Sequence, residues 1–200
     1  MASPTSTYDL VRRFQNGDNG AFSQLFQLYH RRLAVSVYFR MSPDLRVLHE
    51  VDDILQEVFL RASRDMDQFT YRSPGSFMAW LLRIADRVVV DSARYQNRDK
   101  RRAEEMLRFR SESNPTGPDP VDPNTPSRLF AQEEALQLLL KRLDALPADY
   151  RQAILLSKFE GLTTQEVSEQ MGKSRETVAL LLHRGVKKFR ELESAGAPDE

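Results

Sequence analysis

The side chains of this 200-residue chain that could do chemistry are suited to binding rather than to bond making. Its three histidines, His30, His49 and His183, are scattered, and neither an H-E-x-x-H zinc motif nor a glycine-rich phosphate loop after a strand is present. The lack of cysteine excludes a thiolate zinc site, a cysteine nucleophile and a disulfide framework. We therefore predict no enzymatic activity, no catalytic residue, no metal site and no cofactor. The chemistry to expect is recognition of a charged partner.

Positive charge is concentrated in two stretches, although 29 basic and 29 acidic residues cancel over the whole chain. Residues 83–110 hold nine bases against five acids, and residues 173–190 hold six bases against one acid. Local potential matters more than total charge for a polyanionic partner, so nucleic acid is a candidate ligand. Solvated helix faces are often locally basic as well, and charge alone leaves both readings open.

The segment from Thr164 to Leu181 has the pattern of a helix-turn-helix. With Thr164 as the first position, the small residue Ser168 is fifth, where the two helices would cross, and Gly172 is ninth, where the chain would reverse. Thr163 and Glu166 form a capping-box pattern that predicts the start of the first helix. The second helix would enter the major groove with its N-terminal residues and reach phosphates with its basic second half. The expected DNA contacts are Lys173, Ser174, Arg175, Glu176, Thr177, Arg184, Lys187 and Lys188; a helical hairpin that only packs is the alternative.

An acidic cluster lies near the start of a helix predicted over residues 51–66. Asp52, Asp53, Gln56 and Glu57 are expected on the face opposite a row of apolar residues that includes Val58. Acids near a helix N-terminus are favoured by the helix dipole, which is one interpretation. The other is an acidic patch for a basic partner surface.

Helices must position all of these residues, because apolar residues recur at spacings of three and four and no alternating run predicts a strand. We predict an all-α protein of two small helical domains. The first has helices over residues 7–16, 19–40 and 51–66, and a fourth that opens at residues 73–76 and becomes strongly basic. The second has helices over residues 129–146, 147–161, 163–171 and 174–192. Residues 41–43, Met-Ser-Pro, are expected to end the second helix, and the connection over residues 41–50 has no predicted role.

A proline-rich segment separates the two predicted domains. Residues 111–127 hold five of the ten prolines and no Leu, Ile, Phe or other aromatic residue, which indicates an extended linker. The predicted division is therefore 1–110, a linker over 111–127, and 128–200. The chain begins without the apolar run of a signal peptide, and no segment approaches the ~18 apolar residues needed to span a membrane. We expect a cytoplasmic protein without membrane insertion.

The order of these motifs resembles an RNA polymerase sigma factor. D-D-I-L-Q-E-V-F-L-R-A at residues 52–62 is followed by F-x-x-R-S-x-x-S-F-x-x-W-L-x-R-I-A at residues 69–85, a basic helix end, a linker and the helix-turn-helix. The length is similar to that of the extracytoplasmic-function (ECF) group of the sigma-70 family, and the similarity covers about residues 10–192. It implies that the first domain is sigma region 2, a four-helix bundle that binds core polymerase and recognises and melts the minus-ten element. The second domain would be sigma region 4, which reads the minus-thirty-five element.

The resemblance also implies roles for individual residues. In such proteins the helix with the acidic pattern docks on the coiled coil of the largest polymerase subunit, which an acidic face would steer into register. The implied polymerase contacts are Asp52, Asp53, Gln56, Glu57 and Arg61.

The loop from Asp67 to Ser76 corresponds to the part that captures a base flipped out of the minus-ten element. Extrusion of a base costs roughly a few kcal/mol, which stacking and hydrogen bonds in a pocket can offset. Phe69 of this loop and Trp80 of the next helix are expected to belong to the core. Arginines of that helix would neutralise phosphates and hold the melted non-template strand. The implied minus-ten contacts are Tyr71, Arg72, Ser73, Arg83, Arg87, Arg94, Asn97, Arg98 and Arg101.

The recognition helix departs from the family pattern. Many relatives carry arginine at the positions of Ala179 and Leu181, so the upstream promoter sequence is expected to differ from that of relatives. Leu181 would fill core, and Ala179 or Leu180 could touch a thymine methyl group. The implied partners are core RNA polymerase, duplex promoter DNA, the melted non-template strand and an anti-sigma protein, with which the family often works. A free-standing transcription regulator, whose first domain senses or dimerises, is the alternative, and it would not need the acidic face.

Overall fold

The computed structural model describes residues 6–110 and 134–194, and every regular element in these ranges is helical, which confirms the predicted all-α class. The first body comprises α1 (Thr7–Gln15), α2 (Asn19–Arg40), α3 (Pro43–Leu48), α4 (Val51–Asp65), the 3-10 turn η1 (Met66–Gln68) and α5 (Ser76–Arg110). The second body comprises α7 (Glu134–Asp144), α8 (Ala148–Ile154), the π-helical turn η2 (Leu155–Phe159), α9 (Thr164–Met171) and α10 (Arg175–Ser194). No helix within these ranges is long and apolar enough to cross a bilayer.

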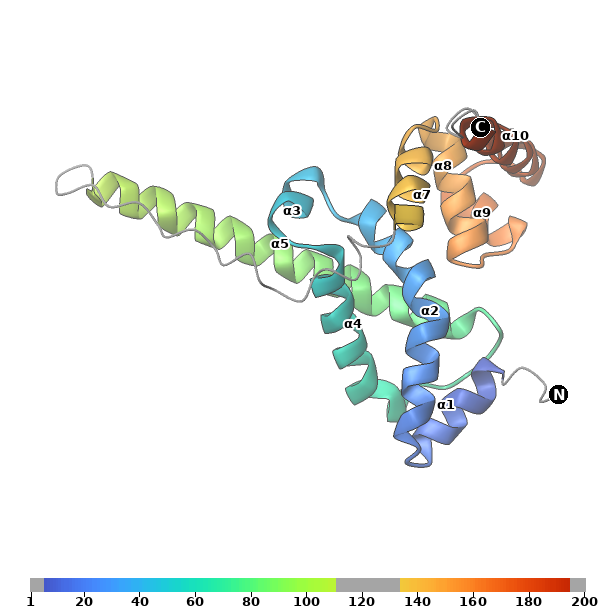
Figure 1. Ribbon diagram of the computed structural model, residues 1–200, viewed down its shortest axis with the longest axis horizontal. Helices are drawn as coiled ribbons and strands as arrows, with labels where there is room; N and C mark the ends of the chain where they lie inside the picture. The colour runs from blue at the N-terminus through green and yellow to red at the C-terminus, as the bar shows by residue number, and fades with distance from the viewer. Residues whose placement is uncertain (1–5, 111–133, 195–200) are drawn as a thin grey trace.

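Helix α2 is the centre of the first body, and α1, α4 and α5 pack around it (Figure 1). Leu25 and Leu33 on α2 are completely buried, and the hydroxyl of the buried Tyr29 is hydrogen-bonded to Thr7 Oγ1 at 2.9 Å. Apolar side chains at spacings of four and eight residues place one row of α2 against its neighbours, as the sequence predicts. Over residues 33–37 every residue of α2 is buried, so a second surface must cover this end of the helix.

A short helix, α3, was not anticipated in the connection between α2 and α4. Ser42 caps it by accepting a hydrogen bond from the Leu45 N–H at 3.2 Å, and Pro43 occupies its first turn. Proline is favoured at this position because it needs no N–H partner there. The same residues that end α2 therefore begin α3, and the side chains of Met41 and Leu45 are buried.

Helix α5 is much longer than the bundle that it helps to form. Its 35 residues correspond to about 52 Å at 1.5 Å per residue, and Figure 1 shows its C-terminal part projecting from the first body. The first half packs in the core through Phe77, Leu81 and Val88. The basic second half is thereby presented away from the bundle.

The second body contains the predicted helix-turn-helix. The capping box is confirmed: Thr163 Oγ1 accepts from the Glu166 N–H at 3.3 Å, and Glu166 Oε2 accepts from the Thr163 N–H at 2.8 Å. Gly172 ends α9 in the left-handed region at φ 63°, the conformation that glycine adopts without a steric cost. The predicted helix over residues 147–161 differs in one respect, because its second half winds into the π-helical turn η2.

The two bodies are in contact and share one continuous apolar core. Leu136, Leu140 and Leu143 of α7 belong to the same cluster of buried residues as Leu33 and Val37 of α2. Helix α2 also packs against η2, which explains why its residues 33–37 are buried on all sides. The predicted linker, residues 111–127, lies outside the described residues, and the division into domains stays a prediction.

Candidate interaction surfaces

The exposed side of α4 carries polar residues that could meet a basic partner. Asp53 and Gln56 are exposed, and the side chain of Glu57 is 39% exposed. Leu60 follows and is 45% exposed. These four residues recur at spacings of three and four and therefore form one stripe along the helix. The α4 stripe is acidic at its N-terminal end and apolar at its C-terminal end.

Asp52 lies outside the α4 stripe, which corrects its predicted place on the exposed face. The residue is only 6% exposed, and its Oδ1 lies 3.8 Å from Nε2 of His30 on α2. Because α4 packs against both α2 and α5, its buried side is wider than a single apolar row and also includes Leu55 and Phe59. Asp52 precedes these two residues by three and seven positions and shares their side of the helix.

Arg61, the last predicted polymerase contact, is engaged within the first body. Its Nε donates to Glu57 Oε1 at 2.6 Å, and its Nη1 donates to Asp91 Oδ2 of α5 at 3.0 Å. These two hydrogen bonds raise the pKa of the Arg61 guanidinium, and the bond to Glu57 makes the larger contribution. Arg61 therefore links α4 to α5 and sets the position of the Glu57 carboxylate.

The loop between η1 and α5 is held in place by a buried aromatic ring and by a side chain of α1. Phe69 is 8% exposed and packs against Phe77 and Trp80, with ring centroids 5.4 and 4.8 Å away, so its predicted core position is confirmed. Gln15 of α1 donates from Nε2 to the carbonyl oxygens of Met66 and Phe69, both at 2.9 Å. One amide thus fixes both ends of the turn that leads into the loop.

The loop presents the predicted base-capture residues at the surface. Tyr71 is half-buried and meets the ring of Tyr8 of α1 edge-on at 5.5 Å. Both tyrosines line an open cavity of about 620 Å³, together with Arg12, Gln15 and Asp67 among others. The exposed residues Arg72 and Ser73 donate their backbone N–H groups to Ser76 Oγ at 3.2 and 3.3 Å. The loop is therefore shaped by local hydrogen bonds while its side chains face solvent.

Four arginines of α5 lie along one side of the helix. Arg83, Arg87, Arg94 and Arg98 are all exposed. At 100° per residue they fall within an arc of about 60°, so they form one basic stripe. The predicted contacts Asn97 and Arg101 have side chains outside the described residues.

The helix-turn-helix is held by a small core and by hydrogen bonds at its turn. Val167 of α9 and Val178 of α10 are completely buried. Ser168 Oγ donates to the Lys173 carbonyl oxygen at 2.6 Å across the turn. Ser174 Oγ accepts from the Thr177 N–H at 3.2 Å and so caps α10. These contacts fix the direction in which α10 leaves the turn.

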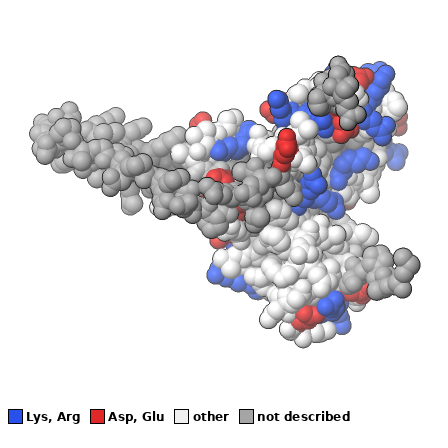
Figure 2. Space-filling model, in the orientation of Figure 1, with Lys and Arg blue, Asp and Glu red and all other residues white. Residues whose placement is uncertain are grey.

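Most of the predicted DNA contacts of the second body are exposed, and Figure 2 shows basic side chains gathered over this body. Lys173 differs, because it is half-buried and its Nζ lies 3.1 Å from Asp149 Oδ2 at the start of α8. Leu180, one of the two predicted contacts for a thymine methyl group, is 46% exposed. The predicted contacts that are exposed are Ser174, Arg175, Glu176, Thr177, Arg184, Lys187 and Lys188.

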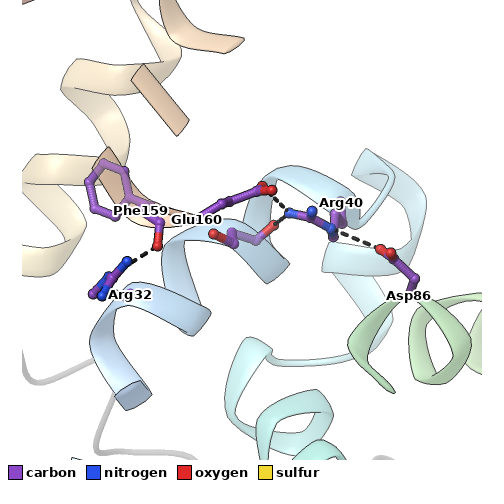
Figure 3. A network of polar contacts seen from close by, with 6 residues as sticks. Arg32, Arg40, Asp86, Phe159 and Glu160 are labelled. Carbon is purple, nitrogen blue, oxygen red and sulfur yellow. Dashed lines mark hydrogen bonds and ion pairs between the residues drawn. The ribbon is translucent and has the colours of Figure 1, made fainter. Parts of the chain in front are cut away.

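Sequence reasoning missed a polar joint between the two bodies. Arg40 near the end of α2 donates to Glu160, the residue after η2, at 2.7 Å, and Arg32 donates to the Phe159 carbonyl oxygen at 3.0 Å (Figure 3). Their sequence context does not distinguish these residues, because a charged residue at a helix end has ordinary solvent-exposed roles. The buried run over residues 33–37 of α2 is the signal that could have indicated a covered surface.

This all-α chain joins a helical bundle, which has an acidic stripe and a basic helix, to a helix-turn-helix body. Such an architecture is that of a DNA-binding transcription factor. Comparison with known proteins narrows the class: the model of the family "ECF sigma factor" matches residues 4–193. The chain belongs to this family and is a sigma factor, which directs promoter-specific transcription. The recognised resemblance is thereby confirmed.

Curated relatives agree with this assignment. The ECF RNA polymerase sigma-E factor of Escherichia coli K12 is 31% identical over 171 residues, which cover 86% of this chain and 85% of the relative. The ECF RNA polymerase sigma factor SigE of Mycolicibacterium smegmatis is 31% identical over 146 residues, or 72% of this chain and 51% of the relative. Among solved structures, CnrH in complex with the cytosolic domain of CnrY covers 94% of this chain and is itself covered to 97%, with a TM-score of 0.45 and 23% identity.

Proposed function

We propose that this sigma factor docks on core RNA polymerase through the α4 stripe and contacts promoter DNA at two elements. The observation that carries the docking assignment is the difference in solvent exposure between the acids on α4. Asp53 and Glu57 face solvent beside Gln56 and Leu60, whereas Asp52 is buried. An acidic stripe with an exposed leucine fits a basic helical partner with an apolar row, such as a coiled coil of the polymerase.

The loop before α5 and the arginine stripe would act on the minus-ten element. Tyr71 provides an aromatic edge beside the cavity shared with Tyr8, and Arg72 and Ser73 provide donors at the surface. A flipped base can stack on an aromatic ring and accept hydrogen bonds from such groups. The stripe of Arg83, Arg87, Arg94 and Arg98 would then neutralise the phosphates of the melted strand.

The second body would read the minus-thirty-five element with the N-terminal turn of α10. Arg175, Glu176 and Thr177 project from that turn, and Lys187 and Lys188 follow for phosphates. Hydrogen bonds from its own backbone N–H and from Ser174 lower the pKa of Glu176, so this side chain acts as a hydrogen-bond acceptor at neutral pH. An anti-sigma protein is the further partner that family membership suggests, and the cytoplasm, where transcription takes place, is the proposed location.

Polymerase capture tests the docking surface. Charge reversal at Asp53 and Glu57 (D53K/E57K) should abolish retention of cognate core polymerase on the immobilised sigma factor while the helical content stays unchanged. Asp65→Lys is the matched control, because Asp65 is an exposed acid at the end of the same helix and outside the α4 stripe. If the double variant retains polymerase as well as the control does, the docking assignment is wrong. Transcription in vitro with core polymerase then tests promoter-specific initiation directly.

A further inference from the structure

Two side chains between α4 and α5 have the opposite charge to the surface that each of them borders. Arg61 is a cation on α4, whose stripe holds two exposed acids, and Asp91 is an exposed anion on α5, which carries the arginine stripe. At 100° per residue, Arg61 lies about 40° beyond Glu57 around α4. By the same measure, Asp91 lies about 20° beyond Arg98 around α5. Each charge therefore stands at the edge of a stripe of the other sign.

The two charges are paired with each other where α4 packs against α5. Arg61 Nη1 donates to Asp91 Oδ2 at 3.0 Å, and Arg61 Nε donates to Glu57 Oε1 at 2.6 Å. One guanidinium thus joins an acid of the proposed docking surface to an acid beside the proposed DNA surface. The side chains of Arg61 and Asp91 are 34% and 54% exposed, so the pair lies at the molecular surface, between the two stripes.

Without Arg61, the nearest cations to Asp91 on its own helix would be those of the arginine stripe. Asp91 follows Arg87 by four positions and precedes Arg94 by three, and side chains at these spacings lie about 5–6 Å apart on a helix surface. A carboxylate left unneutralised there would attract these two arginines and repel the phosphates that they are proposed to bind. Arg87 and Arg94 are exposed in the structure, and Asp91 is engaged by Arg61 instead. The arginine stripe is thereby left available for DNA.

The same pairing affects the α4 stripe. A free guanidinium beside Asp53 and Glu57 would repel the basic partner that is proposed for this surface. The hydrogen bond to Asp91 directs the charge of Arg61 toward α5, and the hydrogen bond from Nε holds the Glu57 carboxylate in place. Ion pairs this exposed contribute little to folding stability. The position of the pair between two charged surfaces is therefore the reason to expect a function for it.

We propose that Arg61 is a positioning residue that lets two surfaces of opposite charge lie side by side on the first body. It neutralises Asp91 at the edge of the arginine stripe and holds Glu57 in the α4 stripe, and it contacts neither polymerase nor DNA itself. This role rests on the proposed function of the two stripes. It replaces the direct polymerase contact that the family resemblance implies for Arg61.

Binding of single-stranded DNA to the full chain tests the neutralisation of Asp91. The probe is fluorescent oligo(dT), whose phosphates bind a basic stripe without regard to sequence. Arg61→Gln should weaken binding about three- to fivefold at low salt, because it leaves Asp91 uncompensated beside the arginines. Addition of Asp91→Asn should recover this loss in full. High salt should remove the difference, since it screens exposed charges.

A double-mutant cycle separates this effect from a simple change in net charge. Arg64→Gln is the matched control, because Arg64 is an exposed arginine of the same helix, three positions further along. Asp91→Asn should raise the affinity for oligo(dT) by less than about twofold in the parent and in Arg64→Gln, but about three- to fivefold in Arg61→Gln. Arg61→Lys, which keeps the charge, should bind oligo(dT) as the parent does and guards against a folding defect in the glutamine variant.

Capture of cognate core polymerase separates positioning from direct contact. Arg61→Gln should retain polymerase within about threefold of the parent, because Glu57 loses a partner while the surface loses a repelling cation. A direct contact would instead make Arg61→Gln fail as D53K/E57K is expected to fail.

Each other outcome overturns a stated part of the proposal. An equal effect of Asp91→Asn with and without Arg61 shows that Arg61 does not neutralise Asp91 toward DNA. Loss of polymerase capture by Arg61→Gln to the level of D53K/E57K shows that Arg61 is a direct contact. A parent chain that fails to bind oligo(dT) or polymerase overturns the proposed function of the corresponding stripe, and the role of Arg61 at that stripe falls with it.

Discussion

Arg40 and Glu160 form an ion pair 2.7 Å long although 120 positions separate them in the sequence. The pair unites the end of α2 with the residue after η2, and Arg40 also donates from Nε to Asp86 Oδ1 of α5. Three helices that come from both bodies therefore depend on one guanidinium.

Removal of that guanidinium should lower the stability of the whole chain. Arg40→Ala leaves the nearly buried Glu160 carboxylate without its counter-ion, and we expect a loss of about 3 kcal/mol in the free energy of unfolding by urea. The double substitution R40M/E160L should recover most of this loss, because it removes both charges. A double variant as unstable as Arg40→Ala would show that Arg40 acts through its packing rather than through the pair.

The two adjacent aspartates of α4 should respond differently to alanine. Asp52→Ala removes a buried polar group and should lower the free energy of unfolding by about 2 kcal/mol. Asp53→Ala alters an exposed position and should change stability by less than about 0.5 kcal/mol while weakening capture of core polymerase. Thermal unfolding and polymerase pull-down on the same preparations separate the two effects, and equal stability of the two variants would refute the buried placement of Asp52.

Gln15 should stabilise the loop before α5, although it is not itself a proposed DNA contact. Gln15→Ala deletes both hydrogen bonds to the carbonyl oxygens of Met66 and Phe69, for which we expect a loss of about 2 kcal/mol. Hydrogen exchange of residues 67–73 should accelerate, and binding of single-stranded DNA should weaken with it. Gln165→Ala, which removes a surface hydrogen bond to Glu169 instead, should leave exchange in that loop unchanged.

The capping box of α9 makes part of the stability dependent on pH. Hydrogen bonds from the Thr163 N–H and hydroxyl lower the pKa of Glu166 below its ordinary value. A carboxylate whose pKa falls on folding stabilises the protein above its unfolded-state pKa, and this contribution is lost as the pH falls through the folded-state value, from about pH 5 toward pH 3. Glu166→Gln should flatten that dependence in acid unfolding curves, and Thr163→Ala should cost about 1 kcal/mol at neutral pH. The idea fails if Glu166→Gln and the parent lose stability equally over this range.

Gly185 should tolerate only a small side chain, because α10 crosses α8 there. A Cβ would lie 3.2 Å from both Ile154 Cδ1 and Tyr150 Cβ. Gly185→Ala gains about 1 kcal/mol of helix propensity, which offsets this tight contact, so we expect little net change. Gly185→Val should destabilise the second body by about 2 kcal/mol through overpacking. Urea unfolding of the two variants checks this, and a valine variant as stable as the alanine variant would contradict the close crossing.

Local patterns in the sequence were sufficient for most helices and for the helix-turn-helix. Thr163 and Glu166 are three positions apart, and Gly172 needs only its own φ to reverse the chain, so their interactions form within a single turn. The apolar rows of α2 and α4 likewise follow from residues one turn apart. The short helix α3 was missed because the Ser-Pro sequence that ends one helix can equally begin another.

Which sides of these helices are covered, and by what, was decided by the tertiary structure. Asp52 is buried because α4 has two neighbours, and residues 33–37 of α2 are buried because the second body packs on them. The pairing of Arg40 with Glu160 also depends on the tertiary structure, because the two residues belong to separate elements and pairing between neighbouring turns of one helix cannot bring them together. The sequence by itself thus determined the helices, the recognition motif and the family, whose signals are local. Only the folded chain decided the burial of charges and the joining of the two bodies, because these depend on surfaces that meet across long sequence separations.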